Sequence, residues 1–149
     1  MQRLYLDSTV PSAYIDERAP ERQRLTVQFW QDRLPSYEPV ISVLVLAEIR
    51  GTRDEQMRRH LETLIETLPL LPATLEAEAL ADQYVARGAI PERYRDDALH
   101  VAIAVSHQIG LLASWNFRHL VKVQVRREIN LINAIMGYGS IEIVSPPEL

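Results

Sequence analysis

The chain has 149 residues, of which 47% are hydrophobic, and a formal net charge of −4. This length fits one domain, residues 1–149, that can bury a sizeable core. The absence of cysteine excludes disulfides, thiolate metal sites and a cysteine nucleophile. The first residues lack the long apolar run of a signal peptide, and no stretch approaches the ~20 apolar residues of a membrane span. We therefore expect a cytoplasmic protein with no membrane association.

Short apolar runs alternate with helix-like stretches along the whole chain. The expected strands are residues 4–6, 40–42, 68–71, 111–114 and 141–144. Helices are expected at about 21–34, 54–67, 74–87, 96–109 and 128–136, and a further helix carries residues 46–49, with Ser42 as its candidate cap and Gly51 as its end. Pro35 and Pro39 are expected to bracket a turn. Strands alternating with helices predict an α/β fold whose parallel sheet is covered on both faces.

Polar side chains occur where such a sheet would bind a ligand, beyond the carboxyl ends of its strands. Asp7 directly follows the first expected strand, and Asn116 lies just past the fourth. Glu48 stands in the otherwise apolar run 43–49, where an unpaired carboxylate would be costly to bury. Asp97 begins the apolar helix 96–109, three residues before His100. Asp7, Glu48 and Asp97 are therefore candidate site residues.

Each of these acids also has a purely structural interpretation. Asp7 could cap the next turn, and Glu48 could pair with Arg50 or Arg53. Asp96 is explained by the helix dipole alone. Adjacent helical residues point ~100° apart, so only Asp97 shares a face with His100. His100 is either a partner of Asp97 or a core histidine, and packing is the favoured interpretation.

Clustered carboxylates repel one another unless a cation compensates them. Oxygen ligands that leave water on the metal suit Mg²⁺ or Mn²⁺, and such a site can activate water for phosphodiester hydrolysis. The sequence has no histidine or cysteine cluster that would favour zinc.

Four segments resemble motifs of the PIN-domain family, which includes the VapC ribonuclease toxins. They are Tyr-Leu-Asp-Ser-Thr-Val at 5–10, Ala-Glu-Ile at 47–49, Asp-Ala-Leu-His-Val-Ala-Ile-Ala at 97–104 and Leu-Leu-Ala-Ser-Trp-Asn-Phe at 111–117. The resemblance covers nearly the whole chain and implies a three-layer α/β/α sandwich and a ribonuclease that uses a divalent metal. It also implies a small antitoxin partner and a homodimer. Within these motifs, four residues are expected to support the metal-binding carboxylates: Ser8, Thr9, His100 and Ser114.

One position departs from the family pattern. Many relatives carry Asp where this chain has Asn116. Asn supplies a neutral carbonyl ligand but no charge. The expected site therefore holds three carboxylates, with Asn116 as a weaker fourth ligand.

A basic segment follows the fourth expected strand: Arg118, Lys122, Arg126 and Arg127 fall within ten residues that contain no acid. These side chains could hold an RNA backbone despite the acidic total, or they could form a solvated helix face. The sequence leaves both interpretations open.

Two other functions are compatible with parts of this sequence. A haloacid-dehalogenase-type phosphatase also begins with a strand and an Asp nucleophile, but Asp7-Ser8-Thr9 lacks its second Asp. A PIN-like module that binds RNA or protein without cleaving would be consistent with Asn116 and the acidic charge. The three intact carboxylates favour the enzyme.

Overall fold

Five short parallel strands form the centre of the molecule, which we describe from a computed structural model of all 149 residues. Their order across the sheet is β3-β2-β1-β4-β5. Their bounds are β1 (Arg3–Leu6), β2 (Glu38–Ser42), β3 (Leu70–Leu71), β4 (Leu111–Ala113) and β5 (Glu142–Val144). Because all the pairings are parallel, the carboxyl ends of β1, β2 and β4 meet at one edge of the sheet.

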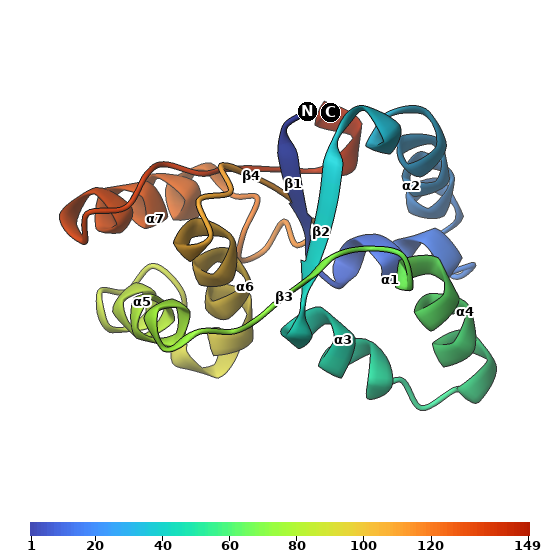
Figure 1. The fold of residues 1–149 in the computed structure, drawn as a ribbon, viewed down its shortest axis with the longest axis horizontal. Coiled ribbons are helices and arrows are strands. Elements are labelled where there is room, and N and C mark those ends of the chain that lie inside the picture. Colours follow the sequence, from blue (N-terminus) through green and yellow to red (C-terminus); the bar gives the residue numbers. More distant parts are fainter.

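Seven α-helices surround this sheet (Figure 1). Figure 1 shows α1, α2 and α4 on one side of the strands and α5, α6 and α7 on the other, while α3 continues from the end of β2. This arrangement confirms the three-layer α/β/α fold. The bounds are α1 (Thr9–Ile15), α2 (Pro20–Asp32), α3 (Val43–Arg50), α4 (Glu55–Ile65), α5 (Leu75–Ala86), α6 (Arg95–Ser106) and α7 (Val123–Ile135).

Local capping fixes several helix ends. Ser42 accepts a hydrogen bond from Val45 N at 3.4 Å, which confirms it as the cap of α3. Thr74 caps α5 in the same way by accepting from Ala77 N at 3.1 Å. After α5, Gly88 has a φ of +85°, which side chains of L-residues rarely adopt.

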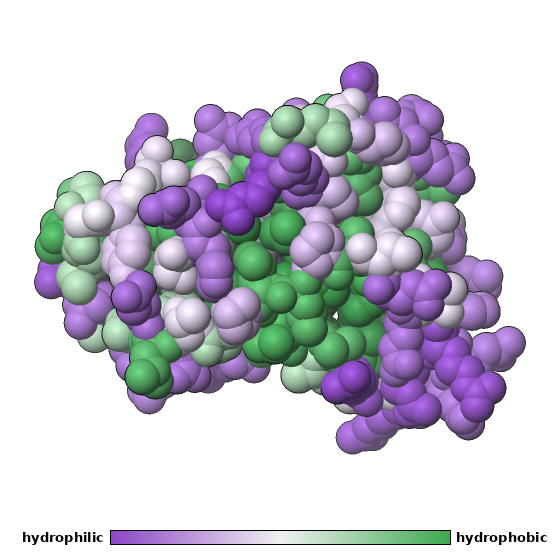
Figure 2. All heavy atoms as spheres, in the orientation of Figure 1, coloured by the Kyte–Doolittle hydropathy of each residue, from purple (hydrophilic) through white to green (hydrophobic).

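The core is continuous from the strands into α6. Every residue from Ala98 to Val105 on that helix is buried, as its apolar sequence predicted. The β3 edge is more open: Leu70 is 45% exposed. Figure 2 shows apolar side chains gathered over β3 and hydrophilic ones over α4.

Three boundaries differ from the sequence-based expectation. Helix α1, directly after β1, was not predicted, and its Pro11 is tolerated because the first turn of a helix leaves N–H groups unpaired anyway. Pro39 lies inside β2 rather than in a turn. The backbone N–H of Ile41 donates to the carbonyl of Pro69, just before β3. Because N–H directions alternate along a strand, the nitrogen of Pro39 points to the same side, but beyond the start of β3. Its missing N–H therefore costs no hydrogen bond of the sheet. Helix α7 begins at Val123, five residues earlier than expected.

None of the helices combines the length and the apolar character that a membrane crossing requires.

Candidate functional site

Asp7 lies at the end of β1 with its carboxylate completely enclosed. It is 2% exposed. Its Oδ1 accepts hydrogen bonds from the Thr9 backbone N at 3.0 Å and from the Thr9 hydroxyl, and its Oδ2 accepts from Ser114 Oγ at 2.5 Å. Burial raises the pKa of Asp7, outweighing the nearby His100 and these hydrogen bonds, which lower it. Asp7 is thus held by donors from the start of α1 and from the end of β4.

Glu48 of α3 is reached by His100 of α6. The Nε2 of His100 lies 2.6 Å from Oε1 of Glu48, and Ser8 Oγ donates to the same oxygen at 2.5 Å. Burial raises the pKa of Glu48, but the hydrogen bond and charge of His100, together with the hydrogen bond from Ser8, outweigh this effect and lower the pKa overall. Since an ionised carboxylate can only accept, the proton of this bond belongs to His100 Nε2.

A buried chain of hydrogen bonds contacts His100 at Nδ1, the ring nitrogen that does not face Glu48. Its Nδ1 lies 2.7 Å from the hydroxyl of Tyr5, which in turn lies 2.7 Å from Ser42 Oγ. Burial raises the pKa of Tyr5 well above its usual range, so the hydroxyl stays protonated. The chain Ser42–Tyr5–His100–Glu48 therefore fixes both nitrogens of the imidazole.

Asp97 stands in the first turn of α6 and is about half-buried. Burial raises its pKa, and the side chain of Asn116 and the charges of His100 and His119 partly oppose this rise. The Oδ1 of Asn116 accepts from His119 N at 3.0 Å. The NH₂ group of Asn116 is therefore the part left to face Asp97.

The three acids influence one another through His100. Burial lowers the pKa of His100, but the bond to Glu48 and the charges of Asp7, Glu48 and Asp97 raise it overall. Glu48 also raises the pKa of Asp97. The structure therefore brings the three predicted carboxylates into one electrostatic neighbourhood at the carboxyl edge of the sheet.

The oxygen donors suit a hard cation, but their present arrangement does not enclose one. No three Asp, Glu or His side chains are positioned to hold a metal ion. Both oxygens of Asp7 accept hydroxyl groups, while Oε2 of Glu48 accepts no hydrogen bond. Asp97 has only Asn116 beside it as a hydrogen-bonding group. Glu48 and Asp97 therefore retain free oxygen atoms of the kind that Mg²⁺ prefers.

Comparison with known proteins gives structural matches only. No model of a protein family matches the sequence, and no curated protein matches it. The structure of VapBC-1 from nontypeable Haemophilus influenzae matches with a TM-score of 0.61 at 16% identity, covering 97% of this chain and 98% of that chain. VapC20 of Mycobacterium tuberculosis, described as a sarcin-ricin loop cleaving toxin, matches with a TM-score of 0.58 at 16% identity, covering 73% and 86%. DNA-bound VapBC of Salmonella typhimurium matches with a TM-score of 0.51 at 19% identity, covering 96% and 98%.

The chain has the VapC fold. The fold implied by the four sequence motifs is thereby confirmed.

Within this VapC fold, the four residues expected to support the carboxylates all contact one of them. Thr9 and Ser114 hold Asp7, and Ser8 holds Glu48. The expectation for His100 needs correction: it is neither a simple core histidine nor hydrogen-bonded to Asp97, because its carboxylate partner is Glu48. The hydrogen-bonding acid therefore belongs to α3 and not to the helix that carries His100.

Sequence reasoning missed Tyr5 and Ser42 as parts of the site. A signal was present, because a tyrosine inside a strand buried on both faces needs a partner for its hydroxyl. Nothing in the sequence indicated that the partner would be His100, 95 residues away.

The four basic residues after β4 do not form one free surface on the VapC fold. The guanidinium of Arg126 donates to the carbonyl of Ile143 at 3.1 Å, which ties α7 to β5. Arg118, Lys122 and Arg127 are exposed. A contact with RNA therefore remains open for these three, whereas Arg126 has a structural partner.

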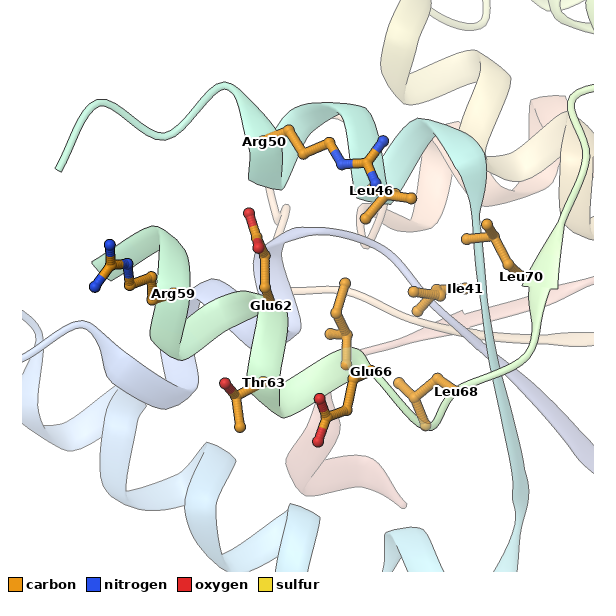
Figure 3. Close-up of a pocket in the computed structure, with 10 residues that line it drawn as sticks. Ile41, Leu46, Arg50, Arg59, Glu62, Thr63, Glu66, Leu68 and Leu70 are labelled. Carbon is orange, nitrogen blue, oxygen red and sulfur yellow. The ribbon is translucent and has the colours of Figure 1, made fainter. Parts of the chain in front are cut away.

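A large cavity lies away from the carboxylates. It measures about 580 Å³ and lies between α3, α4 and the strands β2 and β3, where Figure 3 shows Leu46, Arg50, Glu62 and Leu70 along its wall. Residues 46 and 50 share one face of α3, whereas Glu48 is turned about 160° from residue 46. Cavity size alone would therefore point to the wrong face of α3, and the buried hydrogen-bond network identifies the site better.

Proposed function

We propose that this chain is a magnesium-dependent endoribonuclease that hydrolyses RNA phosphodiester bonds, with manganese as an alternative metal. We further propose that it is the toxin of a type II toxin–antitoxin pair. The observation that carries the proposal is the grouping of Asp7, Glu48 and Asp97 around His100, at the carboxyl edge of a sheet with the VapC fold.

In this proposal Asp97, Glu48 and Asp7 hold the metal. The free Oε2 of Glu48 and the carboxylate of Asp97 are the accessible donors, and at least one side chain must rotate for three to converge. Asn116 is a weaker candidate ligand, because its oxygen already accepts from His119 N. When bound, magnesium would supply charge for the phosphodiester transition state and a more acidic water.

The residues around the acids serve to fix their positions and charges. His100 donates to Oε1 of Glu48 and keeps that carboxylate ionised, which leaves Oε2 directed elsewhere. Thr9 and Ser114 orient Asp7 without adding charge. Carboxylates held in this way lose little freedom when a cation binds, which favours affinity.

Partners follow from the same proposal. Two of the structural matches are described as VapBC bound to DNA. By analogy, we propose a VapB-like antitoxin for this chain, encoded separately, together with an RNA substrate and a homodimer. An antitoxin side chain such as Arg in the acidic neighbourhood would replace the charge of the cation.

The direct cellular test is induction of the chain without its neighbouring genes, followed by mapping of new RNA ends. We expect growth arrest and new 5′-phosphate ends at a limited set of sites, both relieved by co-expression of an adjacent small gene. The Asp97→Asn variant, at equal soluble amount, should give neither effect. Growth and RNA identical to the uninduced culture, with the folded protein present, would contradict the proposal.

A second function, an RNA- or protein-binding module without cleavage, is favoured by one observation. No three acidic or histidine side chains are arranged for metal in the structure. Under this alternative, Mg²⁺ would not raise the melting temperature of the wild-type protein, whereas the enzyme proposal expects that it does.

A further inference from the structure

An arginine lies over two aromatic rings beside the proposed catalytic residues. The guanidinium carbon of Arg22, on α2, is 5.0 Å from the ring centre of Trp115 and 5.8 Å from that of Phe117. The two rings meet edge to face, with centres 5.9 Å apart. Arg22, Trp115 and Phe117 are called the aromatic platform below. Trp115 and Phe117 belong to the fourth sequence motif, whereas Arg22 lies outside all four.

Hydrogen bonds tie this platform rigidly to Asp7. The backbone N of Trp115 donates to Thr9 Oγ1 at 2.8 Å, and that hydroxyl donates to Asp7. The indole N–H donates to Thr26 Oγ1 at 2.9 Å, which fixes the plane of the ring. Because Ser114, the preceding residue, also donates to Asp7, the platform has a fixed position relative to the proposed site.

A cavity of about 280 Å³ adjoins the platform, and it is lined in part by Ser8, Thr9, Ser12, Asp16, Arg22 and Trp115. Hydroxyl groups and the guanidinium of Arg22 therefore lie in the same cavity wall. Arg22 is exposed and forms no ion pair, whereas Asp16 is paired with Arg18 at 2.9 Å. Arg18 first, and Arg22 more weakly, lower the pKa of Asp16. Because no carboxylate forms an ion pair with the Arg22 guanidinium, its N–H donors are available to an anionic ligand.

Packing alone explains Trp115 but not Phe117. Trp115 is 7% exposed and belongs to the core, whereas Phe117 is 47% exposed. An exposed aromatic ring next to a free guanidinium is the combination that holds single-stranded nucleic acid, because a base stacks on the ring and the arginine attracts the phosphate.

We propose that the aromatic platform is a base-binding subsite for single-stranded RNA, in which one base stacks on Phe117 and Arg22 binds the adjoining phosphate. This inference rests on the proposed function, since it makes RNA the ligand. It adds a residue-level account of how the strand is held beside Asp7, and it is independent of metal binding.

The test is binding of a short fluorescein-labelled single-stranded RNA of mixed sequence to the full chain, followed by anisotropy in EDTA so that no cleavage occurs. Phe117→Leu keeps an apolar side chain but removes the π face, and it should weaken binding about 5- to 150-fold. Arg22→Gln should weaken binding and reduce the slope of log K against log salt by about 0.7. Phe117→Leu should leave that slope unchanged.

Arg24→Gln is the matched control. Arg24 lies on the same helix but is paired with Glu21 at 2.6 Å, so its loss should change binding less than about twofold. A thermal melt of each variant shows that it is folded. Equal weakening by Arg22→Gln and Arg24→Gln, wild-type binding by Phe117→Leu, or no RNA binding by the wild type would each overturn the proposal.

Failure of this inference can be told apart from failure of the ribonuclease proposal. If the wild type cuts RNA with magnesium while Phe117→Leu binds as wild type, only the subsite is wrong. If Phe117→Leu and Arg22→Gln weaken binding as described but no condition gives cleavage, the subsite stands and the ribonuclease proposal fails.

Discussion

Replacing Tyr5 by Phe tests the buried hydrogen-bond chain that positions His100. Tyr5 is fully buried, and its hydroxyl contacts only Ser42 Oγ and His100 Nδ1, each at 2.7 Å. The substitution keeps the ring and its packing. It removes both contacts and leaves Nδ1 of the buried imidazole without a partner.

The expected cost follows from these two contacts. Each hydrogen bond contributes about 0.5–1.5 kcal/mol, and an unpaired buried polar group costs about 1–3 kcal/mol. Ser42 keeps its bond from Val45 N, and His100 Nε2 keeps its bond to Glu48, so only Nδ1 of His100 loses its sole partner. We therefore expect a loss of about 2–3 kcal/mol in the free energy of unfolding. For a chain of this size, that lowers the melting temperature by roughly 5–10 °C.

The assay is urea and thermal unfolding in EDTA, with Tyr84→Phe as the control. Tyr84 is equally buried, and its hydroxyl donates to Asn133, outside the site. Both variants should be destabilised, but only Tyr5→Phe should alter the NMR titration of His100. A Tyr5→Phe protein within about 0.5 kcal/mol of wild type, with an unchanged His100 titration, would refute the positioning role.

Three further predictions concern charge at the site. The metal-free protein should be most stable at mildly acidic pH, measured by urea unfolding. The pKa of His100 is raised above its ordinary 6.5, so its contribution to folding stability is complete below pH 6.5 and is lost as the pH rises through the pKa of the folded state. The pKa of Glu48 is lowered below 4.5, so its contribution to folding stability is present above pH 4.5 and is lost as the pH falls through the pKa of the folded state. Glu48→Gln should flatten this profile, and a wild type that is more stable at about pH 8 than at about pH 6 would speak against the pairing. Asp97→Asn should raise the melting temperature without metal, because burial raises the Asp97 pKa and so disfavours its charged form. The variant should also lose the stabilisation by magnesium, which for wild type is about 2.7 kcal/mol at a hundredfold excess over Kd. A lower melting temperature with an unchanged magnesium response would disprove this. Asn116→Asp should tighten magnesium binding in calorimetry and destabilise the metal-free protein, because it places a like charge beside Asp97; equal affinities would remove position 116 from the site.

The layered architecture was readable from the sequence because its signals are local. The apolar runs that became β1 and β4 were found within one residue, since strands buried on both faces are apolar throughout. The cap Ser42 was found for the same reason, because a side chain that accepts from a backbone N three residues on needs no tertiary information.

The errors in the elements have a common physical cause. Helix α1 and the start of α7 lack strong local signals: α1 has Pro11 in its first turn, and α7 begins at Val123 with no side-chain cap. Tertiary packing decides these boundaries. Pro39 was assigned to a turn because only the register of β2 with β3 shows that its missing N–H faces no partner.

The site was only half predictable. The end of a strand identifies Asp7 from local sequence, a charge within an apolar run identifies Glu48, and the helix face identifies Asp97. The partners of these acids come from other elements: Ser114 lies 107 residues from Asp7, and His100 lies 52 residues from Glu48. Such pairings depend on strand order and helix packing, which single-sequence patterns do not contain.

In the proposed function, Asp7, Glu48 and Asp97 form a magnesium-dependent cleavage site. The most direct measurement is cleavage of total RNA by purified protein with Mg²⁺, comparing wild type with Asp97→Asn and with Asp96→Asn. Asp96 is the adjacent acid in the same first turn of α6, but it is exposed. The account predicts that wild type and Asp96→Asn cut RNA, that Asp97→Asn loses most cleavage, and that EDTA stops all of it. Cleavage that persists in EDTA, or that survives equally in both variants, would contradict the account.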